Sequence, residues 1–90
     1  MKQFNFLQGE EKYIEFCVQS CRDTQLVITE ALYELTLNGN LVESGAMHID
    51  GDTVKTLLSP SKLGVYDLEV TVVIPPETIK ASAFVSVRER

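Results

Sequence analysis

The clearest pattern in this chain is an alternation of apolar and polar residues from Gly64 to Ile74. Every even position from 66 to 74 is large and apolar, whereas the odd positions mix acidic residues and a threonine with two valines. A period of two residues is typical of a β-strand with one buried face. Pro75-Pro76 ends the pattern. The segment therefore predicts a strand whose even positions lie in a hydrophobic core.

Similar alternation recurs along the chain in short segments that are separated by turn residues. Asn38-Gly39 is typical of a type I′ hairpin turn, and Asp50-Gly51-Asp52 is a second turn signal. The expected strands are residues 3–7, 12–19, about 29–37, 41–43, 47–49, 53–58, 64–74 and 79–87. Ser44-Gly45 is expected to interrupt the pattern. Seven to eight short antiparallel strands predict an all-β sandwich of two sheets.

The segment from Thr24 to Leu37 allows two interpretations, because its apolar residues fit a helical stripe as well as a strand face. We expect a strand from about residue 29, since the Asn-Gly turn follows at once. In that strand the inward residues are Ala31, Tyr33, Leu35 and Leu37. A helix beginning at Thr24 would contradict the all-β interpretation.

The composition is that of one folded domain, which we expect to cover residues 1–90. The net charge is −5, and the eight basic residues form no cluster that would neutralise successive phosphates. Nucleic acid and anionic membranes are therefore not expected partners. The chain has no apolar run of the length that a signal peptide or a membrane span requires, so we expect a protein that is cytoplasmic as synthesised.

The two cysteines, Cys17 and Cys21, fall in a segment that we interpret as a strand running into a turn. An extended chain would separate their Cα atoms by roughly 13 Å, which is beyond disulfide reach. We therefore expect two free thiols, although a local turn at Ser20 would bring the pair closer.

No residues in the sequence have the spacing of a catalytic or metal-binding motif. The one histidine, His48, is placed by alternation on the solvent face, without the three or four converging ligands of a zinc site. Asp50-Gly51-Asp52 resembles the start of a calcium loop, but a strand resumes at once. The serines and cysteines lack a base and an orienting acid at a recognisable spacing. We expect no catalysis, no cofactor and no metal.

The end of the chain resembles an immunoglobulin-like sandwich. Residues 63–70 are similar to the penultimate strand of such domains, in which a tyrosine at the start of the strand, here Tyr66, lies against the preceding loop. Antibody-type domains carry a cysteine two residues later, where this chain has Leu68, and a core tryptophan, which this chain lacks. The resemblance implies an immunoglobulin-like β-sandwich outside the antibody-type subclass.

A wider resemblance covers nearly the whole chain. Residues 31–45, 49–54 and 64–66 are similar to small immunoglobulin-like proteins of tailed phages and prophages, in which a strand pair around a turn, a Ser-Gly step, a second turn and a Gly-x-Tyr strand recur. This resemblance implies a virion structural or assembly protein. Its partners would be capsid, tail or connector proteins or a second copy of the chain, and its location would be the virion.

Strand parity predicts a protein-contact surface. If strands 29–37 and 79–87 flank strand 64–74, one exposed face carries Leu32, Thr71, Val73 and Phe84. Solvated strands normally carry polar residues there, and an exposed apolar cluster of several hundred Å² marks a contact site. The alternatives are an error of register and exposure without a function.

Other surface features fit an assembly role. Cys17 is expected to face outward, and the charged end Arg88-Glu89-Arg90 is expected to blunt an open edge of the terminal strand. An unguarded edge accepts a strand from a partner.

A rival function is an accessory adhesive or carbohydrate-binding module, for which Phe84 and Tyr13 would supply the stacking aromatic rings. A small enzyme is the weakest rival.

Overall fold

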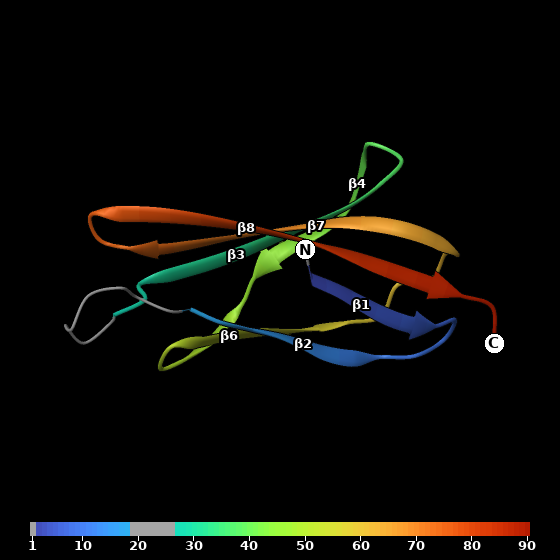
Figure 1. The fold of residues 1–90 in the computed structure, drawn as a ribbon, viewed down its shortest axis with the longest axis horizontal. Coiled ribbons are helices and arrows are strands. Elements are labelled where there is room, and N and C mark those ends of the chain that lie inside the picture. The colour runs from blue at the N-terminus through green and yellow to red at the C-terminus, as the bar shows by residue number, and fades with distance from the viewer. Residues whose placement is uncertain (1, 19–26) are drawn as a thin grey trace.

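The computed structural model describes residues 2–18 and 27–90, which contain eight β-strands and no helix. The strands are β1 (Lys2–Leu7), β2 (Lys12–Cys17), β3 (Glu30–Leu37), β4 (Asn40–Ala46), β5 (His48–Asp50), β6 (Thr53–Leu58), β7 (Gly64–Ile74) and β8 (Glu77–Arg88). They form a five-stranded sheet, β1-β8-β7-β3-β4, and a three-stranded sheet, β2-β6-β5. The two sheets lie over each other as two layers (Figure 1). The expected all-β, two-sheet architecture is confirmed.

The segment with two interpretations forms strand β3 from Glu30 onward, so the helical interpretation is wrong for this part. Thr24, where the alternative helix would begin, lies outside the described residues, as do Cys21 and the expected end of the second strand. Asn38 and Gly39 have φ angles of 53° and 80°, which is the positive-φ pair that a type I′ turn requires. The predicted hairpin between β3 and β4 is therefore confirmed.

One strand pair contradicts the expectation that all strands are antiparallel. β1 runs parallel to β8, with Lys2 opposite Ala83 and Leu7 opposite Arg88. β8 therefore lies between β1 and β7 over this stretch. The expectation that its charged end blunts an open edge is wrong, because β1 covers that part of β8. After β1 the chain turns at Gly9 and crosses to the other sheet.

The turn that leads from β1 to β2 is closed by a carboxylate. The Leu7 N–H donates a hydrogen bond to the Glu10 side chain, and the Glu10 N–H donates to the Leu7 carbonyl oxygen at 3.0 Å. The bond from the Leu7 N–H has the largest effect on the pKa of the Glu10 carboxyl and holds it below the ordinary value of 4.5. The Lys12 ammonium, 3.5 Å away, acts in the same direction.

The core lies between the two layers and is built as the alternation predicts. The even residues of β7, from Tyr66 to Val72, are each no more than 4% exposed. The predicted core positions of β8 are buried only in its second half, since Ile79 is 37% exposed where the β7–β8 hairpin extends past the smaller sheet (Figure 1). The buried core residues are Phe6, Ile14, Ile28, Ala31, Tyr33, Leu35, Met47, Val54, Leu58, Tyr66, Leu68, Val70, Val72, Ala83, Val85 and Val87.

A buried phenol fixes the loop that precedes β7. Tyr66 is fully buried, and its hydroxyl donates to the Lys62 carbonyl oxygen at 2.8 Å. The same hydroxyl accepts from the Lys62 N–H at 3.2 Å. The expected contact between this tyrosine and the preceding loop is therefore present.

Strand β4 passes through Ser44-Gly45, where we had expected a break. Gly45 lies opposite Tyr33, and a Cβ at Gly45 would stand 3.4 Å from the tyrosine ring, so the glycine gives the ring room to pack over the strand. The Tyr33 hydroxyl donates to a carboxylate oxygen of Glu43 at 2.9 Å. Burial, followed by this negatively charged neighbour, raises the pKa of Tyr33 above its ordinary value of 10.0.

Candidate protein-contact face

The outer face of the five-stranded sheet is the surface on which we predicted a contact site. β7 lies between β8 and β3, as the prediction required. Leu32 on β3 lies opposite Thr71 on β7, and Val73 lies two residues further along that strand. Phe84 on β8 projects from the same face. Leu32 and Phe84 are 41% and 38% exposed, whereas Thr71 and Val73 are half-buried.

The four predicted residues share this face but do not form one continuous apolar patch. Phe84 lies opposite Asp67, four residues along β7 from Thr71, which amounts to about 13 Å of strand. Between these two positions a polar row crosses the sheet and consists of Ser82, Glu69 and Glu34. The face therefore has an apolar strip, formed by Leu32 and Val73 with Thr71 beside them, and a separate aromatic position at Phe84. The contact role of all four residues stays a prediction.

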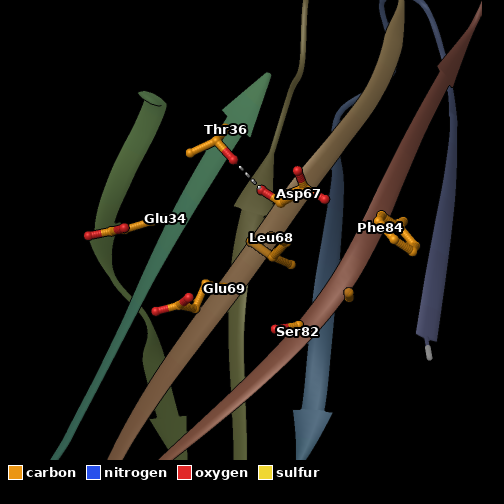
Figure 2. A pocket seen from close by; sticks show the side chains of 8 residues that line it. Glu34, Thr36, Asp67, Leu68, Glu69, Ser82 and Phe84 are labelled. Atoms are coloured by element: carbon orange, nitrogen blue, oxygen red, sulfur yellow. Dashed lines mark hydrogen bonds between the residues drawn. The ribbon is translucent and has the colours of Figure 1, made fainter. Parts of the chain in front are cut away.

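The polar row and Phe84 border a shallow hollow of about 280 Å³. Figure 2 shows Phe84 on β8 at one side, Glu34 on β3 at the other, and Asp67 and Glu69 on β7 between them. The residues that line the hollow are Glu34, Thr36, Asp67, Leu68, Glu69, Ser82, Ala83 and Phe84. We name this feature the acidic hollow. It brings three carboxylates from two strands next to one exposed aromatic ring.

The acidic hollow keeps most of its negative charge. The Lys80 ammonium pairs with Glu69 at 3.0 Å, but both side chains are well exposed and such pairs stabilise weakly. Among residues 2–18 and 27–90, no cation pairs with Glu34 or Asp67. The Thr36 hydroxyl donates to the backbone carbonyl of Asp67 at 3.4 Å rather than to its carboxylate, and Asp67 is exposed. This surface therefore favours a positively charged group.

The other groups that we weighed for chemistry lie apart from this face. His48 is exposed on β5, in the other sheet. Gly51, with a φ of 60°, forms the turn between β5 and β6, so Asp50-Gly51-Asp52 belongs to a hairpin. Cys17 is a free, exposed thiol, as expected, and Cys21 lies outside the described residues. Within the described part of the chain, no three potential metal ligands converge.

Sequence reasoning missed the acidic hollow. The alternation already put Asp67 and Glu69 on the solvent side of their strand, but it gave no reason to bring Glu34 beside them. The signal that would have found it is the register between β3 and β7, which sets Glu34 directly opposite Glu69. None of the described segments forms a helix that is long and apolar enough to cross a membrane.

Comparison with known proteins identifies the fold only. No family model matches the chain, and no curated protein matches it. The crystal structure of an engineered protein superimposes with a TM-score of 0.78 at 14% identity, over 96% of this chain and 18% of that chain. A candidate glycoside hydrolase from Bacteroides vulgatus superimposes with a TM-score of 0.59 at 12% identity, over 93% of this chain and 16% of that one.

At such low identity these likenesses define a class of architecture, an all-β fold of the β-sandwich kind. The chain spans less than a fifth of the length of either similar structure. Function must therefore be argued from the chain's own surfaces.

Proposed function

We propose that this protein is a non-catalytic, immunoglobulin-like protein-binding module that serves as a structural or assembly component of a phage or prophage particle. Two features support the immunoglobulin-like class. The sheet orders β2-β6-β5 and β8-β7-β3 match the B-E-D and G-F-C orders of such sandwiches. The bonds between the Tyr66 hydroxyl and Lys62 match the tyrosine corner of that fold.

The observation that carries the binding function is the acidic hollow beside Phe84. An exposed aromatic ring attracts a cation through its face, and carboxylates hold an arginine or lysine by charge-assisted hydrogen bonds. The apolar strip at Leu32 borders the same face and offers contact area to the rest of a partner. We therefore propose that the partner is a protein that inserts a basic side chain at Phe84.

The phage setting rests on the sequence resemblance, which extends over the β3–β4 hairpin, the β5–β6 turn and the start of β7. In that setting the partner is a capsid, tail or connector protein. The net charge of −5 suits a protein partner with a basic surface and disfavours nucleic acid.

The proposal is tested by co-expressing the chain with each structural protein that its neighbouring genes encode, followed by affinity measurements on any complex. Phe84→Asp should weaken binding at least tenfold, because it removes the ring and adds another negative charge near Asp67. The matched control is Tyr13→Asp, which changes an exposed aromatic on the other sheet and should leave binding intact. Asp67→Asn should also weaken binding and reduce its dependence on salt.

Failure to bind any of these structural proteins would overturn the phage assignment. Full binding by a folded Phe84→Asp variant would overturn the contact face. Circular dichroism and thermal unfolding of each variant confirm that the fold is retained.

A carbohydrate-binding role is a second candidate, which one observation favours. Tyr13 is 63% exposed on the outer face of the smaller sheet, opposite Leu57, which is 40% exposed. A flat exposed ring is the usual platform for a sugar. However, the Lys55 ammonium lies 5.4 Å from the centre of that ring and competes for it. A glycan array bound by the wild type and Phe84→Asp, but not by Tyr13→Asp, would establish this alternative.

A further inference from the structure

One side of the sandwich is closed by two lysines. Strands β1 and β2 are edge strands of their sheets, and they lie on the same side of the molecule. The Lys2 ammonium donates to the Glu15 carbonyl oxygen of β2 at 3.1 Å, and the Lys12 ammonium donates to the Asn5 carbonyl oxygen of β1. We name this pair of contacts the lysine clasp. It occupies edge carbonyls and puts positive charge where a foreign strand would have to pair.

The clasp is reinforced by aromatic rings. Each ammonium lies within cation–π distance of the rings beneath it. Lys2 stands 5.1 Å from the centre of the Phe4 ring and 5.2 Å from that of Phe16, and Lys12 stands 4.6 Å from that of Phe6. These lysines are therefore held over the edge rather than extended into solvent.

Strand β4 forms the opposite edge of the larger sheet and has no such protection. It contains no lysine, arginine or proline, and its single charged residue, Glu43, is held by the Tyr33 hydroxyl. Leu41 and Val42 are 59% and 51% exposed. The other edges are better guarded. β5, at the edge of the smaller sheet, is only three residues long, and the first half of β8, which β1 does not cover, carries Lys80. Of the edges in the described residues, β4 is the least guarded.

We propose that the β4 edge pairs antiparallel with β4 of a second copy of this chain around a two-fold axis at Ser44. The strand is complementary to itself in this register. Glu43 then faces Gly45 of the other copy, and Val42 faces Ala46, so that no like charges meet and the largest side chains lie beside small ones. A two-fold dimer of this kind is the commonest closed assembly of identical chains.

The alternative registers are less favourable. An axis at Glu43, the middle of the strand, would set two carboxylates against each other. An axis at Val42 would fall on the extra residue of the β-bulge, where Leu35 pairs with Glu43 and Thr36 pairs with Leu41. The strand is regular from Glu43 to Ala46, and Ser44 lies within this part.

The low charge of β4 favours a second copy over a charged strand of another protein. A basic or acidic strand would gain nothing from β4, whose only charge already has a hydrogen-bond partner. The contact is confined to one edge strand of seven residues, whereas a standard interface buries roughly 1,200 Å² or more. The dimer is therefore weak and forms as the protein concentration rises.

Disulfide trapping tests the register. In a chain in which Cys17 and Cys21 are replaced by serine, Ser44→Cys should yield a covalent dimer under mild oxidation, since opposite residues of antiparallel strands lie within disulfide reach. Val42→Cys should not cross-link, because each residue then faces Ala46. Ser82→Cys, which changes an exposed serine of β8 at the opposite side of the same sheet from β4, is the control for random collision.

Sedimentation velocity tests the dimer without a cross-link. The wild type should shift from monomer toward dimer with rising concentration, and Ser44→Lys should weaken dimerisation at least tenfold, because it sets two ammonium groups together at the axis. Ser82→Lys should dimerise as the wild type does. A wild type that stays monomeric up to near-millimolar concentration would overturn the proposal. Cross-linking of Val42→Cys or Ser82→Cys to the same extent as Ser44→Cys would also overturn it.

Discussion

Replacing Tyr66 by phenylalanine tests whether one buried hydroxyl fastens the loop before β7. The hydroxyl donates to the Lys62 carbonyl oxygen and accepts from the Lys62 N–H. A hydrogen bond in a folded protein contributes about 0.5–1.5 kcal/mol net. Because Lys62 is exposed, water replaces part of what the variant loses. We therefore expect Tyr66→Phe to lower the free energy of unfolding by about 1–2 kcal/mol, which is in the lower part of the range for the loss of two hydrogen bonds.

The loss is measured by urea denaturation followed by circular dichroism. For a domain of this size the slope is about 1 kcal/mol per molar urea, so that the midpoint should fall by about 1–2 M. Tyr13→Phe removes a hydroxyl from a tyrosine that is 63% exposed and should change stability by less than about 0.5 kcal/mol. A Tyr66→Phe curve that superimposes on the wild type would refute the reasoning, as would an equal loss in the control.

Two further predictions follow from the β1–β2 side of the molecule. Because the bond from the Leu7 N–H depresses the folded-state pKa of Glu10, the stabilisation is present above the unfolded pKa and is lost as the pH falls through the folded value. An NMR titration should place that pKa below 4.5, and an unshifted value would contradict the turn geometry. Lys12→Met opens the lysine clasp and should speed aggregation under agitation, as seen by light scattering, whereas Lys62→Met, with the same change of charge, should not.

Much of the fold can be predicted from the sequence, because a period of two and a few turn residues specify strands directly. The alternation of β7 identified its core residues, and Asn38-Gly39 fixed the β3–β4 hairpin. Strand direction was not predictable in this way, since alternation is the same in parallel and antiparallel pairs. This is why the parallel pairing of β1 with β8 was not expected. The break expected at Gly45 failed because the glycine makes room for the Tyr33 ring rather than ending the strand.

The candidate site could be predicted only in part, for a related reason. Parity assigns each residue to a face, so Leu32 and Phe84 were correctly placed on the outer face of one sheet. Register decides which residues on that face are neighbours, and for β3 and β7, which no hairpin turn joins, no local pattern encodes it. Consequently, the sequence suggested one apolar cluster, whereas the strands are offset so that Glu34 and Glu69 separate its members.

The two proposed surfaces would reinforce each other. A two-fold axis perpendicular to the larger sheet keeps the outer faces of both copies on the same side, so that a dimer through β4 would present two acidic hollows in one direction. A particle surface with repeated basic sites would then bind both hollows, and the second binding event becomes intramolecular, which raises avidity without any new contact. On this reasoning Ser44→Lys should weaken binding to a repetitive particle but leave binding to one isolated partner subunit unchanged, whereas Phe84→Asp should weaken both. If Ser44→Lys changed binding to the particle and binding to the isolated subunit equally, dimerisation through β4 would not contribute to the binding proposed for the outer face.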